Sequence, residues 1–383
     1  MNWNEKIQFG LETLKLEGRL RELFQTPSAS FVHNDYLGLS SHPQIKEAGK
    51  KALNESSCGS QGSRLLGGND ALMEATEKAI ADFFGAPSAL FFSTGYMANL
   101  AAIGSLARLA HQVVSDEKNH ASLIDGIRLG GKPKQVVAHN QWQDCPSDEP
   151  SLLVSESLFS MDGDWVNFQA LKAAWEKGKH FLLLDEAHSA GLFGPQGRGA
   201  HHQFPGWDRK AVVVTFGKTF GVAGAAILCS EPVRQWVINH GRTFIFTTAP
   251  SPVVVAMVRE SLKVVAQADS EREKLFGRCE RLRRAWKKAI PDACPWECRT
   301  DWDWQSPIIP LWIQGNDRAL RFCESMRKCG CDLRAVRYPT VPRGQERVRV
   351  SLNLSTSSEE VALLEKKVVE QWMACSSPEQ IQT

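Results

Sequence analysis

The sequence has no long apolar run, no basic block and no glycine fingerprint of a dinucleotide-binding protein. A membrane-spanning helix needs about 18 or more apolar residues in succession, and the 383-residue sequence contains no such run. The formal net charge is only +2, and Lys and Arg are scattered along the chain. We therefore expect neither a membrane span nor a nucleic-acid-binding surface. The scattered charges still allow a local patch that binds a phosphate group or an acyl carrier.

An export signal is also missing. The N-terminal segment 1–23 carries charged residues where a secretory signal would be apolar. Its apolar residues Trp3, Ile7, Leu11 and Leu14 instead recur at helical spacing. This pattern predicts an amphipathic helix that packs on its own protein, in a cytoplasmic chain.

The ten cysteines are expected to be free thiols, because a long chain without an export signal rarely uses a disulfide framework. Cys294 and Cys298, and then Cys329 and Cys331, suggest a zinc site at first sight. Neither pair has the spacing of a zinc ribbon or finger, and no histidine pair follows at finger spacing. We expect no metal.

Five short apolar runs predict the strands of one sheet. They are rich in Val and Leu and lack the alternation of a half-exposed strand, which favours strands covered on both faces in a mostly parallel sheet. Segments 97–110 and 167–178 lie between some of the runs and read as helices. The runs are residues 89–92, 112–116, 151–156, 181–185 and 211–215. The fold class is therefore α/β.

The sequence pattern changes near residue 300. From there it predicts a strand, a helix, a strand and a helix, which is typical of a small α+β domain. Val348 and Val350 alternate with Arg347 and Arg349, so this strand is expected to have one face in water. We expect one long helix near 252–290 to join the two domains. The predicted divisions are an N-terminal helix and arm (1–45), a large domain (46–285) and a small C-terminal domain (286–383).

Small or ionisable residues follow each of the five predicted strands. In an open parallel sheet, ligands bind beyond the carboxyl ends of the strands. Five strands that deliver such residues to one edge are hard to explain by packing, so the pattern predicts a site there. The residues are, in order, Gly95 and Tyr96, Asp116 and His120, Glu156 and Ser160, Asp185 and His188, and Thr215 and Lys218.

Lys218 follows a strand and lies between Gly217 and Gly221. Two interpretations of Lys218 are open: its side chain ends the strand and points into solvent, or its amine is reactive. Asp185 likewise suits either a salt bridge or a contact with a cationic ring nitrogen, as in pyridoxal-phosphate (PLP) enzymes. Ser93 to Gly95 lie between a strand and a helix, where free backbone N–H groups favour a phosphate. Together these features permit a lysine that forms a Schiff base with an aldehyde cofactor.

Eight segments resemble the α-oxoamine synthases, which are PLP enzymes with the aspartate-aminotransferase fold (fold type I). The segments occur in the family's order, from residue 34 to residue 252, and the resemblance continues beyond residue 350. They are NDYLGLSSHP (34–43), GSQGSRLLGGN (59–69), STGYMAN (93–99), NHASLIDG (119–126), ESLFSMDGD (156–164), DEAHSAGLFGPQGRG (185–199), TFGKTFGVAGA (215–225) and FTTAPSP (246–252).

The resemblance implies a role for each matching residue of the cofactor site. Lys218 would bind the PLP aldehyde and move the α-proton, His120 would stack on the ring, and Asp185 would pair with its nitrogen. His188 and Ser160 would lie near the phenolic oxygen. Gly95 and Tyr96 would offer backbone amides to the cofactor, and Thr215 would help hold its phosphate, with Thr247 or Thr248 reaching the phosphate of a neighbouring subunit. The active unit is then expected to be a homodimer.

The resemblance also implies a substrate site. Arg337 would bind the carboxylate of the amino acid, with Thr340 near the acyl thioester, while Arg21 and Asn34 are assigned to the same site. Each residue has a plainer interpretation: His120 as a surface histidine, Arg337 as a solvated strand residue, and Glu156 as a carboxylate that orients its neighbours.

Among the family's reactions, GSQGSRLLGGN and the N-terminal helix are most similar to members that condense L-alanine with a pimeloyl thioester in biotin biosynthesis. The acyl carrier would be coenzyme A or acyl carrier protein. Acetyl transfer to glycine is the main alternative, followed by 5-aminolevulinate formation and palmitoyl transfer to serine. Two departures stand out: only twelve residues separate Arg21 from Asn34, about half the usual number, and Thr219 replaces a common glycine.

Overall fold

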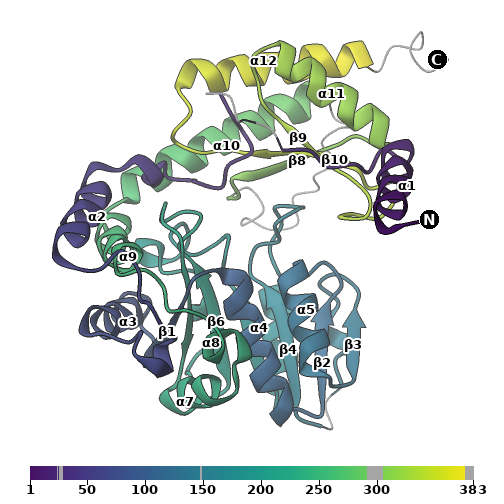
Figure 1. Cartoon of the computed structure of the whole chain (residues 1–383). Helices are drawn as coiled ribbons and strands as arrows, with labels where there is room; N and C mark the ends of the chain where they lie inside the picture. Colours follow the sequence, from purple (N-terminus) through teal and green to yellow (C-terminus); the bar gives the residue numbers. More distant parts are fainter. Residues whose placement is uncertain (24, 26–28, 147–148, 291–304, 376–383) are drawn as a thin grey trace. The chain divides into compact units, whose positions relative to one another are not determined.

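The computed structural model describes residues 1–23, 25, 29–146, 149–290 and 305–375 (Figure 1). These residues form two compact units. The larger unit comprises 35–160 and 164–273, and the smaller comprises 1–34, 161–163 and 274–383, apart from the undescribed positions. The predicted domain divisions at residues 45 and 285 stay predictions.

The larger unit is built on a seven-stranded sheet in the order β1-β7-β6-β5-β4-β2-β3. All five predicted strands are present, and β2 to β6 pair in parallel. The sequence missed β3, which is a short edge strand, and β7, which pairs antiparallel with β1 and β6. The bounds are β1 (Ser88–Phe92), β2 (Gln112–Asp116), β3 (Lys134–Val137), β4 (Ser151–Glu156), β5 (Phe181–Asp185), β6 (Lys210–Thr215) and β7 (Ala225–Cys229).

Helices flank this sheet, which explains why its central strands are buried and mostly apolar. Every residue of β1, β4, β6 and β7 is buried. Leu90, Ile103, Val154 and Val213 belong to the core that α4 shares with the sheet. The helices are α2 (Pro43–Glu55), α3 (Ala71–Phe84), α4 (Gly95–Leu106), α5 (Ala121–Gly130), α6 (Phe168–Lys177), α7 (Glu231–His240), α8 (Arg242–Ile245) and α9 (Pro252–Ala266).

The smaller unit contains a three-stranded antiparallel sheet in the order β8-β10-β9. Its elements are α1 (Trp3–Leu16), α10 (Asp269–Ala289), which begins in the larger unit, β8 (Ile308–Trp312), α11 (Asn316–Lys328), β9 (Arg334–Val336), β10 (Arg347–Ser351) and α12 (Ser358–Cys375). A capping box begins α12: the Ser357 hydroxyl accepts the Glu360 N–H and the Glu360 carboxylate accepts the Ser357 N–H.

Two expectations for the C-terminal part are wrong. The single helix near 252–290 is two helices, α9 and α10, with a break at residues 267–268. The polar face of β10 is also largely out of water, since Arg347 is only 1% exposed and Arg349 is half-buried. The Arg347 guanidinium pairs with Asp162 and lies 3.9 Å from the centre of the Trp312 ring, so partners rather than water satisfy it.

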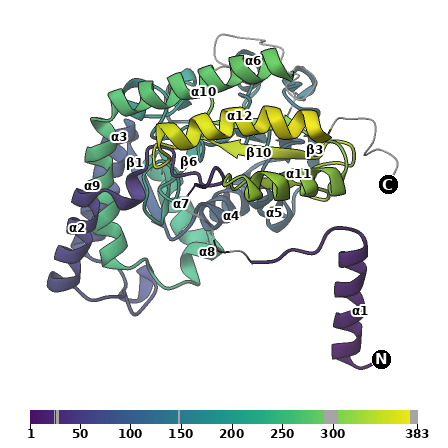
Figure 2. The ribbon, with the colours of Figure 1, turned by 90° about the horizontal axis from the view of Figure 1, so that it is seen from above.

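The N-terminal helix forms as predicted, and an Asn2–Glu5 capping box begins it. Its apolar residues, however, are not buried: Trp3 is 81% exposed and Ile7 56%. Figure 2 shows α1 at the end of an extended segment, apart from the other helices of its unit. The expectation that α1 packs on its own chain is therefore wrong for most of the helix, because none of its residues is buried. Across the described residues, no helix is long and apolar enough to cross a membrane.

Candidate active site

The carboxyl ends of β4, β5 and β6 bring the predicted acidic and basic residues together. Glu156 and Asp185 are register partners at the ends of adjacent strands, and Asp185 also pairs with Val213 of β6. Both carboxyl groups are buried, with Glu156 2% and Asp185 5% exposed. The loop that follows β6 carries Lys218.

Lys218 is part of a hydrogen-bonded chain of three side chains. Its Nζ lies 2.7 Å from His188 Nε2, and His188 Nδ1 lies 2.6 Å from the hydroxyl oxygen of Tyr36. Tyr36 is fully buried and His188 is 4% exposed. The sequence placed Lys218 and His188 at the site but missed Tyr36, although its segment 34–43 was among those that matched the family.

A glycine shapes the loop of Lys218. Gly221 has a φ of +68°, and a Cβ there would lie 2.4 Å from the backbone nitrogen of Ser40. Only glycine combines this backbone conformation with such a close approach. The loop of Lys218 therefore packs on the backbone next to Tyr36.

Asp185 is held by two N–H donors. Asn99 Nδ2 of α4 donates to one carboxylate oxygen over 2.7 Å, and the Ala187 backbone N–H donates to the other over 2.8 Å. The same Asn99 amide contacts the Ser122 hydroxyl at 2.8 Å. Asn99 is a second site residue that sequence reasoning missed, again inside a matching segment, 93–99.

Glu156 has a strongly raised pKa. Burial, and then the charge of Asp185, raises the pKa of Glu156 to about 8. Its carboxyl group accepts the backbone N–H of His120 over 2.6 Å and also that of Ser160. Near neutral pH the Glu156 carboxyl group is therefore mostly protonated.

His120 is the N-cap of α5 and its ring is neutral. Burial lowers the pKa of His120, and Lys218 lowers it further, while Asp185 opposes both. The Ser122 backbone N–H points at His120 Nδ1 over 3.2 Å. An uncharged, fixed imidazole suits stacking against a cofactor ring.

The start of α4 and the end of β6 form a possible phosphate site. Thr94 caps α4 by accepting the Met97 N–H over 3.2 Å, and the Thr215 hydroxyl accepts the Gly217 N–H over 3.3 Å. Among the described residues, only the Thr215 side chain lies within 4 Å of a Cβ built on Gly95 or on Gly217. Space beside the first N–H groups of α4 therefore suits an anion. The Tyr96 side chain itself bonds to Asp125.

Thr247 and Thr248 lie after α8, in segment 246–251. This segment is fixed to the 57–68 loop: the Ala249 N–H donates to the Gly62 carbonyl over 2.9 Å, and the Ser251 hydroxyl donates to the Cys58 carbonyl over 2.6 Å. Thr247 is half-buried and Thr248 exposed. Two of the matching segments, 59–69 and 246–252, are thus neighbours in space.

The four predicted substrate residues belong to the smaller unit. Arg21 donates to the Thr340 hydroxyl over 3.2 Å, and Arg337 bonds to the carbonyl of Gly18, so these three residues lie together. Asn34 lies elsewhere in the unit, where its side-chain oxygen accepts from Arg349 over 2.9 Å.

The zinc interpretation is not supported by the part of the chain that can be described. No group of His, Cys, Asp or Glu there has the arrangement of a metal site. Cys329 and Cys331 are free thiols, and Cys294 and Cys298 lie outside the described residues.

Comparison with known proteins identifies the family. The model of aminotransferase class I and II matches residues 29–365. The chain belongs to this family. It is a family of PLP enzymes, and the expected fold type I architecture is confirmed.

Relatives and solved structures agree with this assignment. The chain is 38% identical to the 8-amino-7-oxononanoate synthase of Burkholderia cenocepacia (strain HI2424), over 97% of this chain and 96% of the relative. It is 40% identical to that of Burkholderia lata, over 97% of each. A serine palmitoyltransferase from S. paucimobilis with a bound PLP–myriocin aldimine superposes with a TM-score of 0.87 at 26% identity, covering 98% of this chain and 99% of that one. The 8-amino-7-oxononanoate synthase of Francisella tularensis gives 0.74 at 26% identity, covering 90% and 98%.

Proposed function

We propose that this chain uses PLP to condense L-alanine with a pimeloyl thioester, giving 8-amino-7-oxononanoate for biotin biosynthesis. The observation that carries the proposal is the lysine–histidine contact at the strand ends, beside the buried carboxylate of Asp185. The names of the relatives at 38% and 40% identity support the substrates.

The residues of the larger unit fit PLP. Lys218 offers an amine for the aldehyde, Asp185 a carboxylate for the ring nitrogen, and the neutral ring of His120 a flat surface. The open space beside Gly95 and Thr215 suits the phosphate. Ser160 and His188 remain the expected neighbours of the phenolic oxygen.

Bound PLP supplies a ring that accepts electrons from the α-carbon of the amino acid. The protein supplies the proton transfers and the orientation. Lys218 Nζ takes and returns the α-proton, and His188 Nε2, 2.7 Å away, shares the hydrogen bond that holds this amine in place. Tyr36 fixes the other side of the His188 ring. Arg337 binds the carboxylate of the substrate, because a guanidinium matches its two oxygens. Thr340, Arg21 and Asn34 complete the proposed substrate site.

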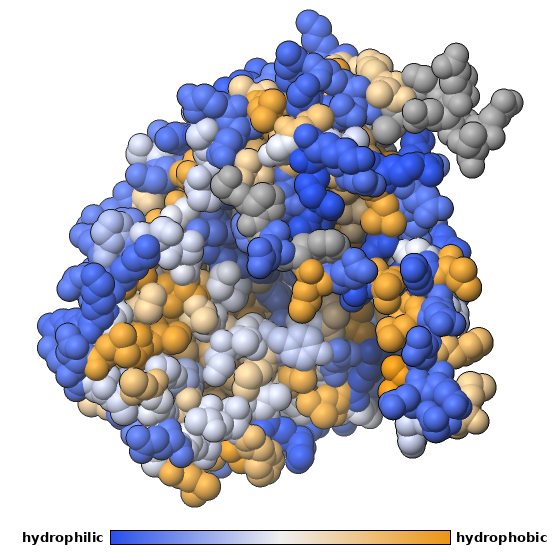
Figure 3. Space-filling model, turned by 45° about the horizontal axis from the view of Figure 1, so that its top comes forward, coloured by the Kyte–Doolittle hydropathy of each residue, from blue (hydrophilic) through white to orange (hydrophobic). Residues whose placement is uncertain are grey.

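A homodimer is part of the proposal. Leu66 is 84% and Phe246 70% exposed, and Phe246 directly precedes Thr247 and Thr248, which the resemblance assigns to the neighbouring subunit's phosphate. The face drawn in Figure 3 shows hydrophobic patches among hydrophilic residues. Burying such surface, together with the apolar side of α1, would favour association. Thr247 or Thr248 would then reach the phosphate bound by the partner subunit. The cytoplasmic location stays a prediction from the charged N-terminal segment.

Visible absorption tests the assignment. Purified protein with PLP is titrated in parallel with L-alanine, glycine and L-serine, the last because solved serine palmitoyltransferases superpose so well. The tightest spectral response is expected with L-alanine, followed by product formation with pimeloyl-CoA or pimeloyl-acyl carrier protein. A preference for glycine or L-serine contradicts the substrate, and no visible band with PLP contradicts the whole proposal.

A further inference from the structure

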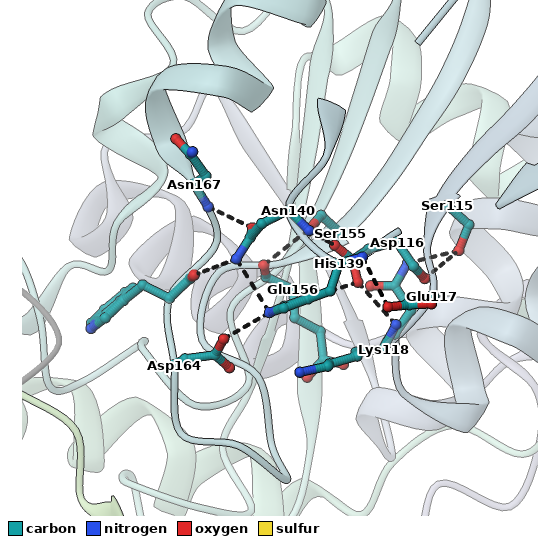
Figure 4. Close-up of polar contacts among 12 residues, drawn as sticks. Ser115, Asp116, Glu117, Lys118, His139, Asn140, Ser155, Glu156, Asp164 and Asn167 are labelled. Atoms are coloured by element: carbon teal, nitrogen blue, oxygen red, sulfur yellow. Dashed lines mark hydrogen bonds and ion pairs between the residues drawn. The ribbon is translucent and has the colours of Figure 1, made fainter. Parts of the chain in front are cut away.

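His139 lies between two carboxylates outside the residues assigned to the cofactor (Figure 4). Its Nδ1 is 3.0 Å from Asp116 Oδ1, and its Nε2 is 2.7 Å from Asp164 Oδ2. The side chain is 14% exposed, so water screens these contacts weakly. None of the segments that matched the family contains this histidine.

The ring of His139 is an imidazolium at neutral pH. A neutral imidazole donates from one nitrogen only, whereas both nitrogens face a carboxylate here. Burial lowers the pKa of His139, but the hydrogen bonds and charges of Asp116 and Asp164 outweigh it and raise the pKa to about 9. Another charged residue in contact is Glu117, which accepts the His139 backbone N–H over 3.0 Å.

The first carboxylate fixes the turn that leads to His120. Asp116 ends β2, and its two oxygens accept the backbone N–H groups of Lys118 and Asn140, each over 2.9 Å. The turn therefore cannot shift without breaking contacts to the loop of His139. Four residues after Asp116, His120 begins α5.

The second carboxylate lies at the base of the hairpin that carries Ser160. The Phe159 N–H donates to the Asp164 carbonyl over 2.9 Å, and Leu158 pairs with Trp165. The edge of the His139 ring also contacts the Phe159 ring, with 4.5 Å between centroids. Ser160 is the next residue, so the hairpin base sets its position.

Asn140 adds a second link between the same loop and the hairpin. Its φ of +63° is in the left-handed region, and its side chain donates to the Trp165 carbonyl over 3.0 Å and accepts the Asn167 N–H over 2.6 Å (Figure 4). The two segments also meet at Glu156, which accepts the backbone N–H groups of His120 and Ser160. A displacement of either segment would disturb this shared acceptor.

We propose that His139 is a positioning residue: as a cation between Asp116 and Asp164, it holds the turn before His120 and the hairpin of Ser160 in the arrangement that binds the cofactor. This inference rests on the proposed function, because it assigns His120 and Ser160 to the PLP site. His139 itself touches no group expected to react.

The test compares two histidine substitutions in the full-length protein. His139→Gln removes the cation, and His180→Gln is the matched control. His180 is 1% exposed and accepts the Ser151 N–H over 3.2 Å, at the opposite, amino ends of β4 and β5. PLP titration at pH 7.5, followed by visible absorbance, is expected to show affinity at least about tenfold weaker in His139→Gln. In His180→Gln the affinity stays within about twofold of wild type, while thermal unfolding of both variants begins at lower temperature.

The pH dependence separates positioning from general destabilisation. The wild-type advantage in PLP affinity over His139→Gln should be full at pH 7 and shrink as pH rises through about 9, where His139 loses its charge. If the ratio of PLP affinities between wild type and His139→Gln stays constant across this pH range, the inference is overturned. An equal loss of PLP affinity in His180→Gln overturns it as well.

A measurement without cofactor keeps the two proposals distinguishable. In protein stripped of PLP, the His139 ring resonance, assigned by its absence in His139→Gln, should titrate near pH 9 by NMR. Titration near the ordinary value of about 6.5 overturns the inference even if wild type binds PLP well. If wild type shows no PLP band at all, the proposed function fails, whatever this titration gives, and the positioning role falls with it.

Discussion

His188 Nε2 lies 2.7 Å from Lys218 Nζ, and the same ring is held on its other side by Tyr36. When Lys218 donates to Nε2, the proton of the neutral ring lies on Nδ1 and is donated to the Tyr36 oxygen. The Tyr36 hydroxyl, which can accept as well as donate, is compatible with this tautomer. This arrangement suits the proton transfer proposed for Lys218.

Tyr36→Phe should lower kcat and leave PLP binding intact. The variant keeps the ring packing but loses one buried hydrogen bond, worth about 0.5–1.5 kcal/mol, so kcat is expected to fall up to about tenfold. Steady-state rates across pH, together with a PLP titration, measure this. A kcat equal to wild type at every pH would mean that the hydroxyl has no part in orienting His188.

Lys218→Ala should abolish the yellow band of bound PLP and almost all activity. Lost proton transfer alone predicts a decrease in kcat of about 10²–10⁴-fold. Lys134→Ala, which removes an exposed lysine at the start of β3, is the control and should behave like wild type. Near-normal turnover in Lys218→Ala would assign the chemistry to another amine.

Asn99→Ala should weaken catalysis through Asp185. The substitution removes the 2.7 Å hydrogen bond to a buried carboxylate, and hydrogen bonds to charged groups are worth about 1.5–3 kcal/mol. We expect kcat to fall about 10- to 100-fold, with altered wavelength of the cofactor band. Asn239→Ala, on the exposed side of α7, makes the same change away from the site. Equal kinetics in the two variants would contradict the role of Asn99.

Glu156→Gln should gain stability relative to wild type as pH rises. The pKa of Glu156 is raised from 4.5 to about 8 in the folded chain, so the unfolded chain releases this proton first. The stability that the protonated form contributes is full below pH 4.5 and is lost as pH rises through about 8. Glutamine has no proton to lose. Thermal unfolding without PLP at several pH values should show that the stability difference between Glu156→Gln and wild type grows between pH 5 and 8. A stability difference independent of pH would mean that Glu156 is ionised in the folded chain.

Arg337→Lys should weaken amino-acid binding more than turnover. A lysine cannot contact both carboxylate oxygens as a guanidinium does, so the Kd for L-alanine is expected to rise about tenfold or more. The titration follows the PLP band, which should itself be unchanged. Arg284→Lys, on the exposed side of α10, is the matched control. An unchanged alanine Kd would remove Arg337 from the substrate site.

The apolar runs predicted the central strands well, because a strand covered on both faces must be apolar along its length. The same rule did not find β3, because β3 is an edge strand with exposed residues. The prediction that the polar face of β10 lies in water was also wrong. There the alternation was real, but Arg347 found partners in Asp162 and Trp312 instead of water. A sequence shows which residues are polar, but it does not show whether water or another side chain will satisfy them.

The sequence by itself determined five of the seven strands of the larger sheet, the residues at their ends and the resemblance that named Lys218, Asp185, His188 and His120. These follow from local patterns of apolar, glycine and ionisable residues. Only the tertiary structure decided the partners: Tyr36 for His188, Asn99 for Asp185, and His139 between two carboxylates. It also decided the protonation of Glu156, because a pKa depends on burial and on neighbouring charges that come together only when the distant segments of the chain fold.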